Sequence, residues 1–90
     1  MRVARRYIIS GRVQGVGFRY FTEAAAQREG VSGWVRNLPD RSVEAVAEGD
    51  IDAVERFERA VRRGPPGARV DHVRVDENYP VAGETEFSIK

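Results

Sequence analysis

The chain has 90 residues, of which 41% are hydrophobic and 32% charged, so we expect one globular domain, residues 1–90, with a modest core. It contains no cysteine and a single histidine, His72, which excludes disulfides, a thiol nucleophile and a zinc site built on two imidazoles. The formal net charge of +1 is too small to indicate nucleic acid. Because no apolar run approaches the about 20 residues that span a bilayer, we expect a cytoplasmic protein without a membrane partner.

The first predicted elements are a strand, a glycine-rich loop and a helix. Residues Val3–Ser10 carry apolar side chains on both faces of the strand, which is typical of a central strand. The loop Gly11–Gly17 contains three glycines. Residues Phe18–Arg28 have apolar side chains at helical spacing, and Gly30 follows as a C-terminal stop, so they predict a helix.

A hairpin and a second helix follow. Residues Ser32–Leu38 and Ser42–Glu48 alternate as strands and are joined by a tight turn at residues 39–41. Residues Asp50–Arg63 predict an amphipathic helix in which Asp50 is the N-cap. Its inward stripe is expected to comprise Ile51, Val54, Phe57 and Val61.

Two strands complete the pattern, one at Arg69–Glu77 with Val73 and Val75 buried, and a short one at Glu86–Ile89. The element order is therefore βαββαβ with a short extra C-terminal strand. Since a hairpin separates two right-handed crossovers, both helices should pack on one face of a mostly antiparallel sheet. This α+β arrangement is the ferredoxin-like sandwich, which by itself does not determine a function.

The segment from Gly11 to Arg19 is a candidate anion-binding site. Glycines allow positive φ, so successive backbone N–H groups can turn inward, and the start of the following helix adds free donors and the positive end of its dipole. Arg19 would add a permanently charged, bidentate grip on phosphate. Most glycine-rich loops only turn the chain, and this one has neither the dinucleotide fingerprint nor the GK[ST] motif of nucleoside triphosphatases.

The distribution of charge also favours an anion site in the first half of the chain. Residues 1–41 contain eight arginines against three acids, a net charge of +5. Residues 42–90 contain six arginines and Lys90 against eleven acids, a net charge of −4. Folding can interleave the two halves, so charge scattered over the surface is an equal alternative. Because Lys90 is the only lysine, any positive charge used in chemistry should come from arginine.

A second polar cluster lies in the first strand of the predicted hairpin, at Gly33–Asn37. Strand alternation places Trp34 and Arg36 on one face and Val35 and Asn37 on the other. Asn37 is a poor strand residue, and its side chain could bond to the backbone of the turn or take part in chemistry. Trp34 is expected to pack on the sheet, and Arg36 to be solvated.

Together, GRVQGVGFR and GWVRN resemble the two signatures of the acylphosphatase family, and length and element order extend the resemblance over the whole chain. By position, Arg19 corresponds to the phosphate-binding arginine of the family and Asn37 to its water-positioning asparagine. The resemblance implies that the phosphate-binding loop comprises Gln14, Gly15, Val16, Gly17, Phe18 and Arg19.

The activity implied by the resemblance is hydrolysis of the carboxyl–phosphate bond of a small acyl phosphate. No metal or cofactor is expected, because the leaving carboxylate has a conjugate-acid pKa of about 4 and needs no general acid. Phosphoryl transfer then depends mainly on positioning and electrostatics. We expect phosphate- or sulfate-like anions as ligands, no nucleic-acid partner and a monomer.

One position departs from the family pattern. Arg41 occupies the place, four residues after the asparagine, where the family usually has glycine. If the turn requires positive φ there, arginine costs about 1–2 kcal/mol; otherwise the turn changes type.

Three alternative functions share this fold. RNA-binding RRM domains have the same element order, but the predicted strand SVEAVAEG is acidic and lacks the aromatic residues they need. A small-molecule regulatory domain would need a partner domain, for which this chain has no second segment. Acylphosphatase-like domains also begin the hydrogenase-maturation carbamoyltransferases, where carbamoyl phosphate is the substrate; a chain of 90 residues favours the simple hydrolase.

Overall fold

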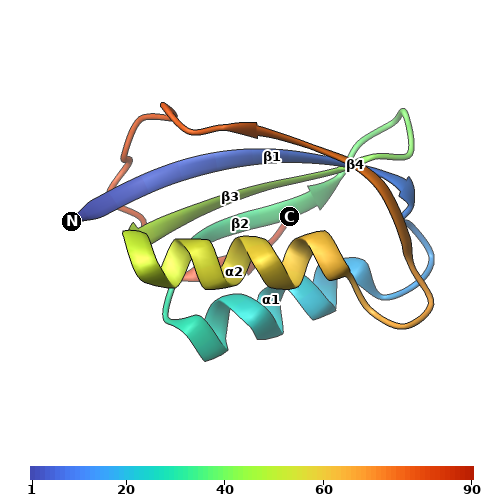
Figure 1. Ribbon diagram of the computed structural model, residues 1–90, viewed down its shortest axis with the longest axis horizontal. Helices are drawn as coiled ribbons and strands as arrows, with labels where there is room; N and C mark the ends of the chain where they lie inside the picture. Colours follow the sequence, from blue (N-terminus) through green and yellow to red (C-terminus); the bar gives the residue numbers. More distant parts are fainter.

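The computed structural model describes residues 1–90 as a five-stranded sheet with two helices on one face (Figure 1). The order βαββαβ with a short C-terminal strand confirms the predicted ferredoxin-like sandwich. The strands lie in the order β4-β1-β3-β2-β5, and only the β2–β5 pair is parallel. The elements are β1 (Arg2–Arg12), α1 (Phe18–Glu29), β2 (Ser32–Asn37), β3 (Val43–Asp50), α2 (Ile51–Arg63), β4 (Arg69–Asp76) and β5 (Phe87–Ile89).

The central position predicted for the first strand is confirmed, since β1 pairs with β3 on one side and β4 on the other. β1 continues two residues beyond its predicted end, because Gly11 and Arg12 still pair with β4 after a shift of register between Ser10 and Gly11. Gly11 has a φ of 126°, and a Cβ there would clash with the carbonyl oxygen of Arg69. The strand therefore bends at a glycine just before it enters the loop.

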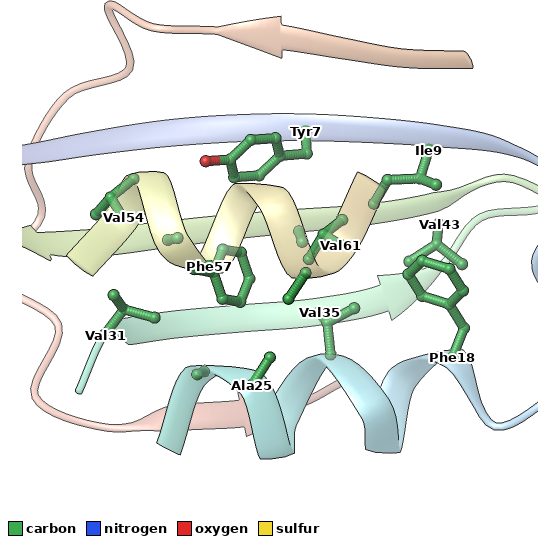
Figure 2. Close-up of a cluster of buried hydrophobic side chains, with 14 of the residues drawn as sticks. Tyr7, Ile9, Phe18, Ala25, Val31, Val35, Val43, Val54, Phe57 and Val61 are labelled. Carbon is green, nitrogen blue, oxygen red and sulfur yellow. The ribbon is translucent and has the colours of Figure 1, made fainter. Parts of the chain in front are cut away.

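The core lies between the sheet and the two helices (Figure 2). Phe57 of α2 is its centre, with ring centroids 5.9 Å from those of Tyr7 and Phe87. Of the predicted inward stripe, Val54, Phe57 and Val61 are buried, whereas Ile51 begins the helix and is half-buried. The burial of these apolar side chains supplies the main stabilisation of the fold.

Two further expectations concern the second helix and the edge of the sheet. Asp50 caps α2 as predicted, its carboxylate accepting a hydrogen bond from the backbone N–H of Asp52. The prediction that Val73 and Val75 are buried is wrong in degree, since both are only half-buried. The reason is that β4 is an edge strand and makes little contact with α2.

The antiparallel pairing brings three chain segments to one end of the molecule. β1 ends where β3 begins and where β2 ends, so the loop before α1 lies beside the turn between β2 and β3. Figure 1 shows this end at the right, with the start of α1 and the end of α2 next to it. The two signature segments therefore converge.

Candidate functional site

A pocket at this end of the sheet collects the candidate residues. It offers a space of about 100 Å³, which is enough for several water molecules. That volume suits a small anion. The lining residues are Val13, Gln14, Gly15, Gly17, Phe18, Arg19, Tyr20 and Asn37.

The loop in this pocket has the geometry of an anion-binding nest. Gly15 and Gly17 adopt left-handed conformations, with φ of 75° and 76°, and Gly17 is the N-cap of α1. The backbone N–H groups of residues 14–17 donate no hydrogen bond within the protein. No side chain caps α1 and its first turn contains no acid, so its N-terminal donors also remain open. The loop and the helix start thus form one set of unpaired donors.

Arg19 lies in the first turn of α1 and lines the pocket. Its side chain is half-buried and forms neither an ion pair nor a hydrogen bond within the protein. By contrast, eight of the fourteen arginines form ion pairs. Arg19 is unlike them because its guanidinium has no acidic partner and lies beside N–H groups that are also unpaired. The guanidinium remains available for an anion.

Asn37 is the last residue of β2 and faces the same pocket. It is paired with Val43 in the ladder, and its side chain is exposed and forms no hydrogen bond within the protein. The turn after it is held by other groups, among them the Asp40 carboxylate, which accepts a hydrogen bond of 3.0 Å from the N–H of Ser42. The alternative that Asn37 serves to satisfy turn backbone is therefore wrong.

Among the six residues assigned to the phosphate-binding loop, Gln14 directs its side-chain amide toward the turn between β2 and β3. Its Nε2 donates hydrogen bonds to the carbonyl oxygens of Leu38 and Ser42, both at 2.9 Å. Phe18 is likewise turned inward and is buried in the core beside Phe21. Val16 is half-buried and is absent from the pocket lining.

Tyr20 was not assigned a role from the sequence, yet it lines the pocket. It directly follows Arg19 in the first turn of α1, and 68% of its surface is exposed. An exposed aromatic residue one position after the candidate anion-binding arginine is the signal that could have identified it. Its ring is therefore accessible at the rim of the pocket.

The other face of the sheet holds the remaining residues of the second cluster. Arg36 is exposed, as expected, and its Nε also lies 2.6 Å from Glu44, which binds Arg6 at 2.6 Å as well. Because two guanidinium groups outweigh the effect of burial, they hold the pKa of Glu44 below its usual value. Trp34 packs on this face as predicted, with the Lys90 ammonium 4.3 Å from its ring.

The structure offers neither a metal-binding cluster nor a membrane-spanning helix. No group of three or more His, Cys, Asp or Glu side chains is arranged to hold a metal ion. His72 is exposed, as expected from its place in β4. Neither helix has the length and apolar character needed to cross a membrane.

Comparison with known proteins gives consistent matches over the chain. The acylphosphatase family model matches residues 5–89. The acylphosphatase of Rubrobacter xylanophilus is 52% identical over 85 residues, which cover 94% of this chain and 77% of that protein. The crystal structure of acylphosphatase from Bacillus subtilis has a TM-score of 0.94 and 42% identity, and the match covers 100% of this chain and 99% of that one.

A larger protein also contains a similar segment. The crystal structure of HypF from T. kodakarensis matches with a TM-score of 0.80 and 32% identity, covering 100% of this chain but 12% of that one. Sequence identity to this segment, 32%, is lower than to the acylphosphatases of Rubrobacter xylanophilus and Bacillus subtilis, at 52% and 42%. Because the family model extends from the first strand to the last and the pocket described above lies between the two signature segments, the chain belongs to the acylphosphatase family.

Proposed function

We propose that this chain hydrolyses acyl phosphates to a carboxylate and inorganic phosphate in the pocket between the loop of residues 13–19 and Asn37. The observation that carries the proposal is the convergence of three unpaired groups in one small space. These groups are the free N–H donors of the loop, the guanidinium of Arg19 and the side-chain amide of Asn37. Family membership supplies the reaction class.

Arg19 and the loop bind the phosphoryl group in this mechanism. The N–H groups of residues 14–17 and the start of α1 surround the phosphate oxygens, and Arg19 neutralises their charge. Because these donors are held by the fold before the substrate arrives, they stabilise the charge that develops on the equatorial oxygens. Because the same groups would bind a free anion, we expect phosphate or sulfate to compete with the substrate.

Asn37 positions the attacking water. Its amide holds the water in line with the bond that breaks, while the water oxygen forms a new bond to phosphorus. The carboxylate leaves with the electron pair of the broken P–O bond, and a proton of the water passes to a phosphate oxygen. No general acid is needed, because the leaving carboxylate is a weak base.

We also propose a domain organisation, an oligomeric state and a location for the protein. Residues 1–90 act as one domain, as a cytoplasmic monomer without nucleic acid. The absence of an RNA partner is supported by β3, whose Glu44 and Glu48 side chains lie on the sheet face that an RRM would use and are buried in ion pairs with arginines. Retardation of single-stranded RNA at low salt would contradict this part of the proposal.

Hydrolysis of benzoyl phosphate, followed by ultraviolet absorbance in the presence of EDTA, tests the function. We expect saturable turnover by the wild type, no loss on chelation, and competitive inhibition by inorganic phosphate. Turnover lost with EDTA and restored by Mg²⁺ would overturn the metal-free mechanism. No turnover at all would overturn the assignment of the pocket.

A further inference from the structure

The side chain of Gln14 connects the phosphate-binding loop to the turn that follows Asn37. Its Nε2 lies 2.9 Å from the carbonyl oxygen of Leu38 and 2.9 Å from that of Ser42. These carbonyls are the first and last of the turn between β2 and β3. One amide nitrogen therefore bonds to both ends of the turn from a loop more than 20 residues away in the sequence.

The two carbonyls already take part in the hydrogen bonds of the turn. The N–H of Leu38 donates to Ser42 at 2.9 Å, and the N–H of Arg41 donates to Leu38 at 3.1 Å. Each carbonyl oxygen thus accepts two hydrogen bonds, one from a backbone N–H of the turn and one from Gln14. Both lone pairs of each carbonyl oxygen are therefore used. Gln14 is an external brace on a turn that contains the strained residue Arg41.

Asn37 is placed by the same brace. It directly precedes Leu38 and forms the last pair of the β2–β3 ladder, with Val43. Its own side chain has no hydrogen bond that would fix its distance from the loop. The bonds from Gln14 are the only side-chain hydrogen bonds that link the loop to the turn beside it.

On the basis of the proposed function, we propose that Gln14 is a positioning residue, which holds Asn37 at the distance from the phosphate-binding loop that aligns the water with the scissile bond. A primary amide suits this role because its nitrogen offers two N–H donors. A carboxylate in its place would face two carbonyl oxygens with acceptors alone. A misplacement of about 1 Å can cost about 100-fold in rate, so a brace of this kind has a measurable effect.

A double-mutant cycle between Gln14 and Asn37 tests the proposal. Gln14→Met, Asn37→Ala and the double variant are compared in kcat and KM for benzoyl phosphate and in Ki for inorganic phosphate. Gln14→Met has nearly the same volume but no donor, and Gln14→Asn keeps the donors but is one methylene too short. The control is Gln27→Met, the same chemical change at an exposed position of α1 whose side chain has no hydrogen bond. Circular dichroism and thermal melting confirm that each variant is folded.

We expect Gln14→Met to lower kcat about 10- to 100-fold in the wild-type background, with Ki for phosphate changed less than about twofold. In the Asn37→Ala background the same substitution should lower kcat less than about threefold further, because no positioned water remains to be misplaced. Gln14→Asn should behave like Gln14→Met, and Gln27→Met like the wild type.

Three results would overturn the proposal. These are an unchanged kcat in both Gln14 variants, an equal loss in both backgrounds, and a rise in Ki that matches the loss in kcat, which would mean that Gln14 supports only the loop. In each of these cases Asn37→Ala still lowers kcat, so the proposed function stands. If the wild type shows no turnover, or if Asn37→Ala keeps its kcat, the proposed function fails and the role of Gln14 fails with it.

Discussion

Arg19 and Asn37 lie in the same pocket but are assigned to different parts of the reaction, so their replacement should separate binding from turnover. Arg19 is the only side-chain cation in the pocket, and we expect Arg19→Ala to abolish both phosphate binding and turnover. We expect Asn37→Ala to lower kcat about 100-fold or more while Ki for phosphate changes less than about twofold. Steady-state kinetics with phosphate as inhibitor measures both. A near-normal kcat in Asn37→Ala would contradict its role.

Arg41 allows a second prediction at the scale of one residue. It is the only non-glycine residue with positive φ, at 77°, so the turn keeps the conformation that glycine usually provides. Relief of the left-handed strain, about 1–2 kcal/mol, exceeds the extra chain entropy that glycine loses on folding. We expect Arg41→Gly to raise the free energy of unfolding by about 1 kcal/mol, measured by urea denaturation. Arg41→Ala removes the same charge but keeps the strain, so equal stabilisation by both would contradict the explanation.

At the scale of elements, Glu48 of β3 fixes the segment that returns from β4 to β5. Only 1% of its side chain is exposed, and its carboxylate accepts hydrogen bonds from the N–H groups of Ala82 at 2.8 Å and Gly83 at 2.9 Å, with Arg2 also at 2.9 Å. Burial tends to raise the pKa of this carboxyl, but the two N–H donors and Arg2 outweigh it and hold the pKa below its usual value. The charged form therefore holds the segment in place.

This arrangement predicts a loss of stability in acid. Because the folded-state pKa of Glu48 lies below the unfolded value of about 4.3, its contribution is fully present above that pH and is lost as the pH falls through the folded-state pKa. We expect Glu48→Gln to lower the free energy of unfolding by about 2 kcal/mol at pH 7 and to reduce the slope of stability against pH below pH 4.3. The control is Glu86→Gln, an exposed change without an ion pair. An unchanged slope in Glu48→Gln would contradict the assignment.

At the scale of the whole molecule, arginines without ion pairs gather at the end that holds the pocket. Arg12 ends β1, Arg63 ends α2 and Arg41 lies in the turn, and none of them forms an ion pair. At the opposite end Asp50 and Asp52 lie at the start of α2, and the Asp50 carboxylate is paired with the terminal ammonium of Met1 at 3.1 Å. The molecule therefore presents its positive end to an anionic substrate (the right-hand end of Figure 1).

Electrostatic attraction of the substrate should follow from this separation. We expect kcat/KM to fall about three- to tenfold as the ionic strength rises from about 0.01 M to about 1 M, where the Debye length shrinks from about 30 Å to about 3 Å. The value of kcat should change little. Arg12→Gln combined with Arg63→Gln should flatten this dependence, whereas Arg28→Gln at the opposite end should not. Equal salt dependence in all variants would exclude steering by this end.

The sequence by itself determined the order and type of the elements, because local signals carry that information. Helical spacing and glycine stops bounded the helices, Asp50 marked the N-cap of α2, and alternation placed Asn37 on the face of Val35. The signature segments also determined the family, since their residues are contiguous in the chain. These features depend on interactions between residues a few positions apart.

Only the tertiary structure decided how distant segments meet. The bend at Gly11 depends on the carbonyl of Arg69, the ion pairs of Glu44 depend on three neighbouring strands, and the side chain of Gln14 turned out to bind the hairpin. The two halves of the sequence also mix in space, because α2, from the acidic half, ends at Arg63 on the same side of the molecule as the end of β1 at Arg12. The physical reason is that sheet order and packing set these contacts, and no local pattern in the chain encodes them.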